Sequence, residues 1–96
     1  MIIVTGHVSV KPERLGEALT ESLRHVHRSR LEPGCVSHSV QVDAEDPNRL
    51  VFFEQWADMD ALKTHFGVPE SGEFVRALTA MATGAPELVM YEATRL

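Results

Sequence analysis

Three residues that lie close together in the chain have side chains that could do chemistry on a small molecule. The segment Glu54–Phe66, EQWADMDALKTHF, contains a carboxylate, Glu54, the only tryptophan, Trp56, and an imidazole, His65, nine residues after the tryptophan. An imidazole has an unperturbed pKa of ~6.5, which suits a general base near neutral pH. A carboxylate can orient that imidazole, and an indole offers a flat apolar wall. The segment therefore contains a candidate acid or base beside groups that could form one wall of a pocket.

Each of the three residues also has a purely structural interpretation. A single large aromatic residue at a strand end, such as Trp56, often closes a hydrophobic core. His65 could be a partly buried residue whose ring bonds a backbone carbonyl. Glu54 lies in an apolar strand, where burial of a carboxylate is costly, so it either faces solvent or has a partner. The choice between packing and chemistry depends on where the surrounding elements place these side chains.

A succession of strands and helices is predicted to position them. Alternating residues predict strands over residues 2–10, 35–42, 49–56 and 86–96. Apolar residues three to four apart predict helices over residues 13–30, 59–66 and 72–83, with Pro12 in the first turn of the first helix and Asp58 as the cap of the second. Turn-forming segments, EPG, DAEDPN and GVPESG, separate several of these elements. The predicted order is βαββαβ, with the second helix interrupted.

The second predicted helix determines where His65 lies. Met59, Leu62 and Phe66 stand at i, i+3 and i+7 and predict a buried stripe along this helix. With ~100° between successive residues, His65 lies about 60° from Leu62 and about 100° from Phe66. The histidine is therefore expected at the rim of the stripe, within reach of a pocket between helix and sheet.

The third predicted strand places a carboxylate and an indole on one face. Successive side chains on a strand point to opposite faces, so Phe52, Glu54 and Trp56 share a side. His65 follows on the helix that leaves this strand. We therefore expect the carboxylate, the indole and the imidazole to approach one small volume.

The order βαββαβ predicts an α+β fold of the ferredoxin-like type, in which an antiparallel sheet carries both helices on a single face. The other face also carries large apolar groups, because Ile3 points away from Ile2 and Val4, and Phe53 points away from Phe52. An uncovered sheet face of this kind requires a partner. The sequence therefore predicts a homodimer in which two sheets pack face to face.

Composition limits the other possibilities. The 96 residues are expected to form one domain, 1–96, and their net charge of -5 argues against a nucleic-acid partner. No apolar run approaches the ~20 residues that span a membrane, and the N-terminal segment alternates like a strand rather than a leader, so we expect a cytoplasmic protein with no membrane partner. Cys35 is the only cysteine and is interpreted as a core thiol. One basic group is interpreted as a solvated helix face: Arg24, His25, His27, Arg28 and Arg30.

The five histidines show no recognised metal-binding spacing. His25 and His27 are two residues apart, which is about 200° around a helix, and His7, His38 and His65 belong to no HExxH-type pattern. No glycine-rich nucleotide loop is present either. The sequence therefore predicts neither a metal nor a nucleotide cofactor.

The segment EPGCVSHSVQVDAEDPNRLVFFEQWADMDALKTHF resembles the antibiotic biosynthesis monooxygenase (ABM) domain, especially its small quinol monooxygenase-like members. The resemblance spans nearly the whole chain and depends on Glu32–Cys35, the run Glu54-Gln55-Trp56, and His65 nine residues beyond. It implies a dimeric α+β barrel of ferredoxin-like subunits. Characterised members oxidise phenolic or quinol-type aromatics with dioxygen and need no flavin, haem or metal. Others degrade haem or isomerise a signal molecule, so fold alone does not decide the reaction.

The resemblance also argues against haem chemistry. Haem-degrading members carry an asparagine in the first strand, a second tryptophan and an iron-ligating histidine, where this chain has Gly6, His65 and Val75. We therefore expect a cofactor-independent monooxygenase acting on a small quinol or polyphenol and dioxygen. The alternatives are an isomerase or haem-degrading oxygenase on the same fold, or a non-catalytic module that binds or senses an aromatic ligand.

The expected roles of the individual residues follow from this resemblance and from their chemistry. His65 is the candidate base, and Glu54 is the candidate group that orients its imidazole. A pocket for a planar ring is expected to be lined by further residues: Phe52, Trp56, Phe66, and His38 or Tyr91.

Overall fold

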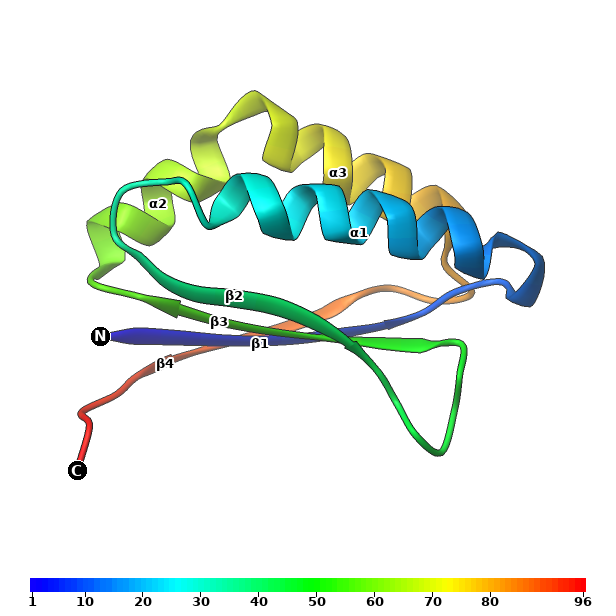
Figure 1. Cartoon of the computed structure of the whole chain (residues 1–96), viewed down its shortest axis with the longest axis horizontal. Coiled ribbons are helices and arrows are strands. Elements are labelled where there is room, and N and C mark those ends of the chain that lie inside the picture. The colour runs from blue at the N-terminus through cyan, green and yellow to red at the C-terminus, as the bar shows by residue number, and fades with distance from the viewer.

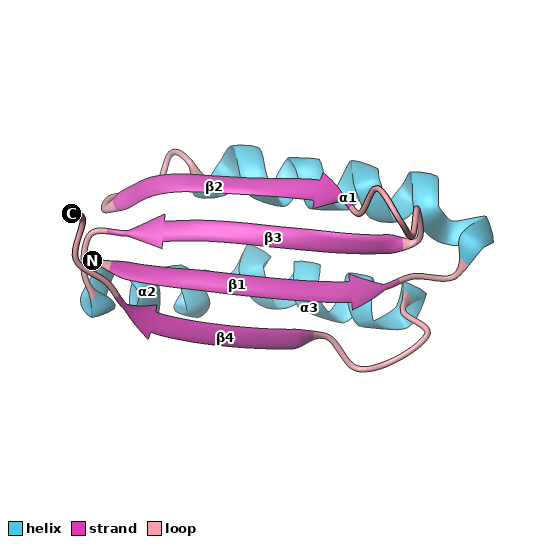
Figure 2. Ribbon diagram, turned by 90° about the horizontal axis from the view of Figure 1, so that it is seen from below, coloured by secondary structure: helices cyan, strands magenta, loops and turns pink.

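The computed structural model describes all residues, 1–96. The chain forms one antiparallel sheet that carries its helices on a single face (Figure 1). The strands are β1 (Ile2–Ser9), β2 (Cys35–Val42), β3 (Arg49–Trp56) and β4 (Glu87–Glu92), and the helices are α1 (Leu15–Ser29), α2 (Met59–Gly67) and α3 (Pro69–Met81). A 3₁₀ turn, η1 (Pro12–Arg14), precedes α1. The sheet order is β2-β3-β1-β4 (Figure 2), so the predicted βαββαβ ferredoxin-like fold is confirmed.

The second helical region departs from the prediction in its boundaries. Only Val68, with φ -66° and ψ 128°, separates α2 from α3, and α3 begins at Pro69 rather than near residue 72. Proline suits the first turn of a helix because the amide it lacks has no intrahelical partner there. The predicted cap of α2 is confirmed, since the Asp58 carboxylate accepts a hydrogen bond from the Ala61 amide at 2.8 Å.

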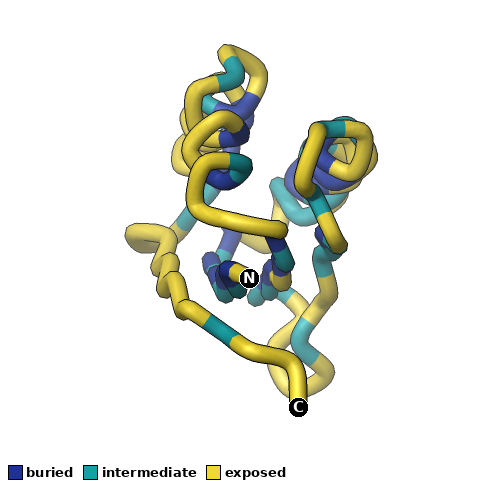
Figure 3. Tube along the Cα trace, turned by 90° about the vertical axis from the view of Figure 1, so that its left-hand side faces the viewer, coloured by how far each residue is buried: buried dark blue, intermediate teal, exposed yellow.

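The interior between the helices and the sheet contains two groups of apolar side chains. Buried positions alternate along β1 and β3, as expected for strands with one covered face. The larger group, called the apolar cluster below, contains Val8, Val10, Ala18, Leu50, Phe52, Phe74, Leu78 and Met81. The smaller group contains Ile2, Val4, Trp56 and Leu62. Figure 3 shows buried positions where helices and strands face one another, while the chain near the C terminus is exposed.

The buried stripe of α2 differs from the prediction. Leu62 is buried, but Met59 and Phe66 are 37% and 46% exposed, and His65 is only 2% exposed. The helix is rotated so that Leu62 and His65, three residues apart, face the sheet together. His65 is therefore not a rim residue, as predicted, but a fully buried one.

The inward face of α1 also differs from the prediction. Leu23 was expected in the stripe but is 45% exposed, whereas Ser22, His25 and Ser29 are buried. The Ser29 hydroxyl donates to the His25 carbonyl at 2.7 Å, which satisfies that buried hydroxyl within the helix. The interpretation of His25 as part of a solvated basic face is therefore wrong.

The sheet face opposite the helices is open in this chain, as Figure 2 shows. Ile3 pairs with Tyr91 and Thr5 with Val89, so these side chains share that face, and every residue of β4 is exposed. Phe53 on β3 is 38% exposed on the same side. The homodimer expected from this apolar face stays a prediction. Among the helices, none has the length and apolar character needed to cross a membrane.

Candidate active site

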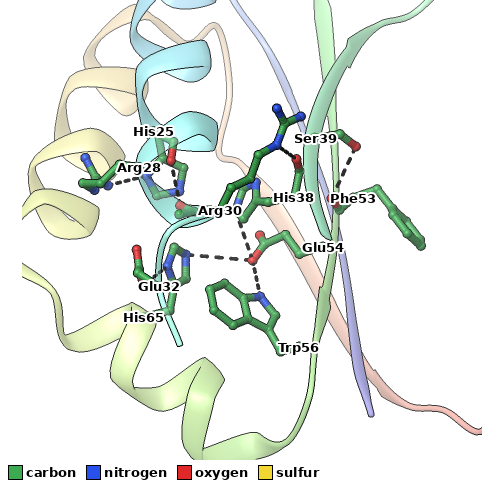
Figure 4. Close-up of polar contacts among 11 residues, drawn as sticks. His25, Arg28, Arg30, Glu32, His38, Ser39, Phe53, Glu54, Trp56 and His65 are labelled. Atoms are coloured by element: carbon green, nitrogen blue, oxygen red, sulfur yellow. Dashed lines mark hydrogen bonds and ion pairs between the residues drawn. The ribbon is translucent and has the colours of Figure 1, made fainter. Parts of the chain in front are cut away.

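Glu54 is the centre of a buried polar group between the sheet and the helices (Figure 4). Its carboxylate is buried, and Oε1 accepts a hydrogen bond from Trp56 Nε1 at 2.8 Å. The same oxygen lies 3.3 Å from Nε2 of His38 and 3.9 Å from Nε2 of His65. His38 stands directly opposite Glu54 in the pairing of β2 with β3. Glu54 therefore has partners, as its burial requires.

The ionisation of Glu54 follows from these partners. Burial alone would raise the pKa of this carboxyl. The neighbouring His38 imidazole, the Trp56 N–H donor and the His65 imidazole all favour the carboxylate and together outweigh burial, so the pKa of Glu54 lies below its usual value. Glu54 is consequently a carboxylate at neutral pH, and it places a buried negative charge beside two imidazoles.

A second carboxylate orients His65. Nδ1 of His65 lies 2.9 Å from Oε1 of Glu32, a residue of the loop between α1 and β2. A carboxylate only accepts hydrogen bonds, so Nδ1 carries the proton and donates it to Glu32. In the neutral ring the lone pair is therefore on Nε2, the nitrogen nearer Glu54.

The loop that carries Glu32 requires a glycine. Gly34 has a φ of 82°, in the left-handed region that side chains other than glycine rarely adopt. A Cβ at Gly34 would also lie 2.5 Å from the Cβ of Ala61 on α2. This close contact between loop and helix holds Glu32 beside His65 and gives a physical reason for the EPGC sequence.

His25 comes from α1 and lies against the same group of residues. Its ring stacks on Phe74 with 4.1 Å between ring centres and 8° between planes. The guanidinium nitrogen Nη2 of Arg28 lies 2.6 Å from Nδ1 of His25. Because a guanidinium group can only donate hydrogen bonds, Nδ1 accepts and the ring proton of His25 lies on Nε2. Burial, together with the charges of His38, His65 and Arg28, lowers the pKa of His25 to about 3. His25 is therefore neutral.

His38 has the most unusual environment of the three histidines. It is 1% exposed, and neither ring nitrogen has a partner in hydrogen-bond geometry, although Glu54 is within ion-pair distance. Its backbone carbonyl accepts from Arg30 Nε at 2.9 Å, which fixes the strand rather than the ring. A buried imidazole with free nitrogens is costly unless something binds it. We call His25, His38, His65 and Glu54 the histidine cluster.

A cavity of about 240 Å³ opens beside the histidine cluster. Its lining residues come from both helices and strands, and they include Gly6, His25, His38, Phe52, Glu54, His65, Phe66, Phe74 and Leu78. Gly6 lies against the neighbouring strand at this lining, because a Cβ there would be 3.2 Å from the Glu87 carbonyl oxygen. A cavity of roughly 150 Å³ binds benzene in another protein. The space therefore suits one substituted aromatic ring.

The structure brings together most of the predicted site residues. Glu54, His65, His38 and Phe52 all line the cavity, and Phe66 lies at its exposed side. Trp56 is fully buried behind Glu54 and is absent from the lining, so it supports the site from beneath.

Two predicted pocket residues do not line the cavity: Trp56, which lies beneath it, and Tyr91. Tyr91 pairs with Ile3, which points away from the helices, and it is 51% exposed. The register between β1 and β4 therefore puts the phenol on the open sheet face, and the prediction for Tyr91 is wrong within this chain.

Sequence reasoning missed two residues of the site, His25 and Glu32. The signal for His25 was present, because Ser22, His25 and Ser29 follow the three- and four-residue spacing of an inward helix face. For Glu32 no periodic signal exists, since its position depends on a loop. The argument against a metal site considered spacing along the chain, whereas the fold gathers three histidines from α1, β2 and α2.

The chain is therefore a ferredoxin-like α+β domain that buries histidines and a carboxylate beside an aromatic-lined cavity. The family described as Antibiotic biosynthesis monooxygenase (ABM) matches residues 1–77. This chain belongs to that family.

Two relatives are similar to this chain over most of its length. The uncharacterized protein sll1783 of Synechocystis is 35% identical over 91 residues, which is 95% of this chain and 62% of that protein, so the chain spans about three-fifths of that relative. YcnE of Bacillus subtilis, whose monooxygenase designation is provisional, is 34% identical over 65 residues, 68% of each chain.

Solved structures share the fold over nearly the whole chain. A crystal structure of an antibiotic biosynthesis monooxygenase superposes with a TM-score of 0.91 at 28% identity, covering 99% of this chain and 100% of that one. A Deinococcus radiodurans protein provisionally given the same designation has a TM-score of 0.95 at 25% identity, covering 100% and 95%.

Proposed function

We propose that this protein is a cofactor-independent monooxygenase that oxidises a small quinol or polyphenol with dioxygen. The observation that carries the proposal is the orientation of His65. Glu32 accepts a hydrogen bond from Nδ1–H, so the lone pair of the neutral ring lies on Nε2, and the residue lines an aromatic-lined cavity. A base within a largely apolar cavity is what proton abstraction from a phenol requires.

The proposed reaction begins with a quinol or polyphenol that has a ring C–H ortho or para to a hydroxyl. Nε2 of His65 takes the proton of that hydroxyl, and the resulting phenolate passes one electron to dioxygen to form a radical pair. Combination of this pair at the ring C–H carbon forms a peroxide, whose distal oxygen receives a proton from His65. The ring carbon loses its hydrogen, the O–O bond breaks, and the products are a quinone and water. One oxygen atom enters the product, and the substrate loses four electrons to one molecule of dioxygen.

The two carboxylates have different roles in this proposal. Glu32 keeps the His65 ring in the tautomer that presents a free Nε2, which makes it a positioning residue. Glu54, whose Oε1 lies 3.9 Å from that Nε2, stabilises the imidazolium that forms when the proton moves. Trp56 holds the Glu54 carboxylate through its N–H.

An aerobic screen of quinols and polyphenols, with oxygen uptake recorded, tests the proposal. Wild-type protein and the His27→Gln variant should consume oxygen with the same substrate, because His27 is exposed on α1 and lies outside the cavity. The His65→Gln variant should not. Tight binding of aromatic ligands with background oxygen uptake would refute the enzyme and favour a binding module.

We also propose that the protein is a homodimer. The open sheet face carries Ile3, Phe53, Val89 and Tyr91, and an exposed apolar face of this kind favours a second copy of the chain. Light scattering at micromolar concentration should give twice the chain mass of 10.7 kDa. A monomer at that concentration would contradict the assembly without affecting the proposed chemistry.

A further inference from the structure

Four buried groups in the histidine cluster have the types and separations of metal ligands. His25, His38 and His65 each offer a ring nitrogen, and these atoms lie within 4.8 Å of one another. Oε1 of Glu54 lies 3.3 Å from Nε2 of His38 and 3.9 Å from Nε2 of His65. We propose that His38, His65 and Glu54 bind a divalent transition-metal ion, with His25 beside its open coordination positions.

The separations are close to those that an ion would impose. Metal–nitrogen and metal–oxygen bonds to imidazole and carboxylate are ~2.0–2.2 Å, so ligand atoms in tetrahedral or octahedral sites are about 3–3.6 Å apart. The pair of Glu54 with His38, at 3.3 Å, already lies in this range. The pair of Glu54 with His65, at 3.9 Å, would need a small inward movement. The ring nitrogens of His38 and His65 lie within 4.8 Å of one another, so they would also move closer together around an ion.

The protonation of His65 is the one a metal ligand needs. Metal-binding histidines usually donate their second ring nitrogen to a carboxylate or carbonyl, which fixes the ring and strengthens the ligand. His65 donates from Nδ1 to Glu32 at 2.9 Å and leaves Nε2 free on the side of Glu54. Glu32 thus completes a carboxylate–histidine–metal arrangement.

His38 is the independent observation that indicates a ligand. Both of its ring nitrogens are buried and have no hydrogen-bond partner, and the residue lines the cavity. In either neutral tautomer, one of these nitrogens has a free lone pair. A bound ion would satisfy this nitrogen and neutralise the charge of Glu54 at once.

His25 differs from the other two histidines. Because Arg28 donates to its Nδ1, the ring proton lies on Nε2, so the ring is a hydrogen-bond donor and not a ligand in this arrangement. We therefore assign three protein ligands rather than four. His25 is instead suited to donate to an oxygen atom held by the ion.

The donor set selects the kind of ion. Two imidazoles and one carboxylate with open positions suit Fe²⁺, Co²⁺, Ni²⁺ or Zn²⁺. Ca²⁺ and Mg²⁺ prefer sites made of oxygen atoms. The metal site does not depend on the proposed function. It conflicts with that function at one atom, because an ion bound to Nε2 of His65 occupies the lone pair that the base would use. Metal binding should therefore inhibit the metal-free oxidation.

Titration of chelator-treated protein with Co²⁺, recorded by the visible absorption of the bound ion, tests the site. Calorimetry with Zn²⁺ then measures the affinity independently. We expect one ion per chain. His38→Gln should lower the affinity at least ~100-fold, since even residues that only support a ligand contribute ~10–100-fold. His27→Gln, a change of the same kind at an exposed position on α1, should bind the ion like wild type.

Two results would overturn the metal site. One is the absence of saturable binding by wild-type protein whose circular dichroism shows that it is folded. The other is unchanged affinity in both His38→Gln and Glu54→Gln. If His38→Gln does not fold, Glu54→Gln, which keeps the shape of the side chain, decides the matter. Each readout is a binding measurement. A negative result would therefore refute the metal site without testing the oxidation of quinols.

Discussion

The apolar cluster and the histidine cluster adjoin where His25 stacks on Phe74, yet they differ in what holds them together. The apolar cluster consists of hydrocarbon side chains buried between α1, α3 and the sheet. The histidine cluster buries three imidazoles and a carboxylate, and leaves the ring nitrogens of His38 without hydrogen bonds. Burial of hydrocarbon stabilises a fold, whereas burial of polar groups without full partners destabilises it. The comparison fits our proposal that the first cluster stabilises the fold and the second performs the chemistry.

The largest effect is expected in the apolar cluster. Leu50 is 0% exposed, so Leu50→Ala should lower the free energy of unfolding by about 2–5 kcal/mol, through lost burial and the cavity left behind. Leu31→Ala, the same change at a residue that is 87% exposed, should be nearly neutral. Chemical denaturation measures both. Similar values for the two variants would break the distinction between core and surface.

A change in the histidine cluster should affect activity more than stability. Replacement of the His65 base by glutamine should lower kcat for a quinol at least ~100-fold, because general base assistance contributes ~100- to 10,000-fold. The unfolding free energy should fall by less than in Leu50→Ala, since glutamine nearly fills the same volume. Near wild-type turnover by His65→Gln would show that the imidazole is not the base.

Loss of the positioning carboxylate should have a smaller effect. Glu32→Gln keeps the shape of the side chain but removes the negative charge that fixes the His65 tautomer. We expect kcat to fall with little change in KM, and Co²⁺ affinity to fall by ~10–100-fold. Steady-state kinetics and the Co²⁺ titration report these separately. If KM changes and kcat does not, Glu32 contacts substrate rather than orienting His65.

The smallest effect is expected outside both clusters, in the turn between β2 and β3. The Glu45 amide and the Arg49 side chain donate to Asp43, and they lower the pKa of its carboxyl below the usual value. A carboxyl whose pKa is lower in the folded state stabilises the fold at pH values above its unfolded pKa of ~3.9. This contribution is lost as the pH falls through the folded pKa. Asp43→Asn should therefore be slightly less stable than wild type at neutral pH. Thermal unfolding should show this difference shrinking in acid, and a difference that grows there would contradict the assignment.

The parts of the site that were predictable depend on local periodicity. Alternation along β3 places Phe52, Glu54 and Trp56 on the helix-covered side, and the structure confirms this facing. The short connection from β3 to α2 then brings His65 near them. These positions follow from the regular geometry of a strand and a helix, so residue spacing is enough to predict them.

The parts that were not predictable depend on tertiary contacts. Glu32 reaches His65 only because the Gly34 turn packs against Ala61. His25 appeared to belong to a charged surface, since arginines surround it in the sequence and serines share its buried face. The facing of Tyr91 depends on the register of β4 against β1. In each case the position of the residue depends on how separate elements pack. The spacing of residues within one element carries no information about that packing.

Oxygen consumption by chelator-treated wild-type protein tests directly whether the histidine cluster performs the chemistry without an added cofactor. With a quinol found in the aerobic screen, we expect one molecule of dioxygen to be consumed per molecule of quinone formed. We also expect inhibition when Zn²⁺ is added. Turnover that disappears after chelation and returns only with a metal ion would contradict the cofactor-free base mechanism. Absence of oxygen uptake above background would contradict the enzyme itself.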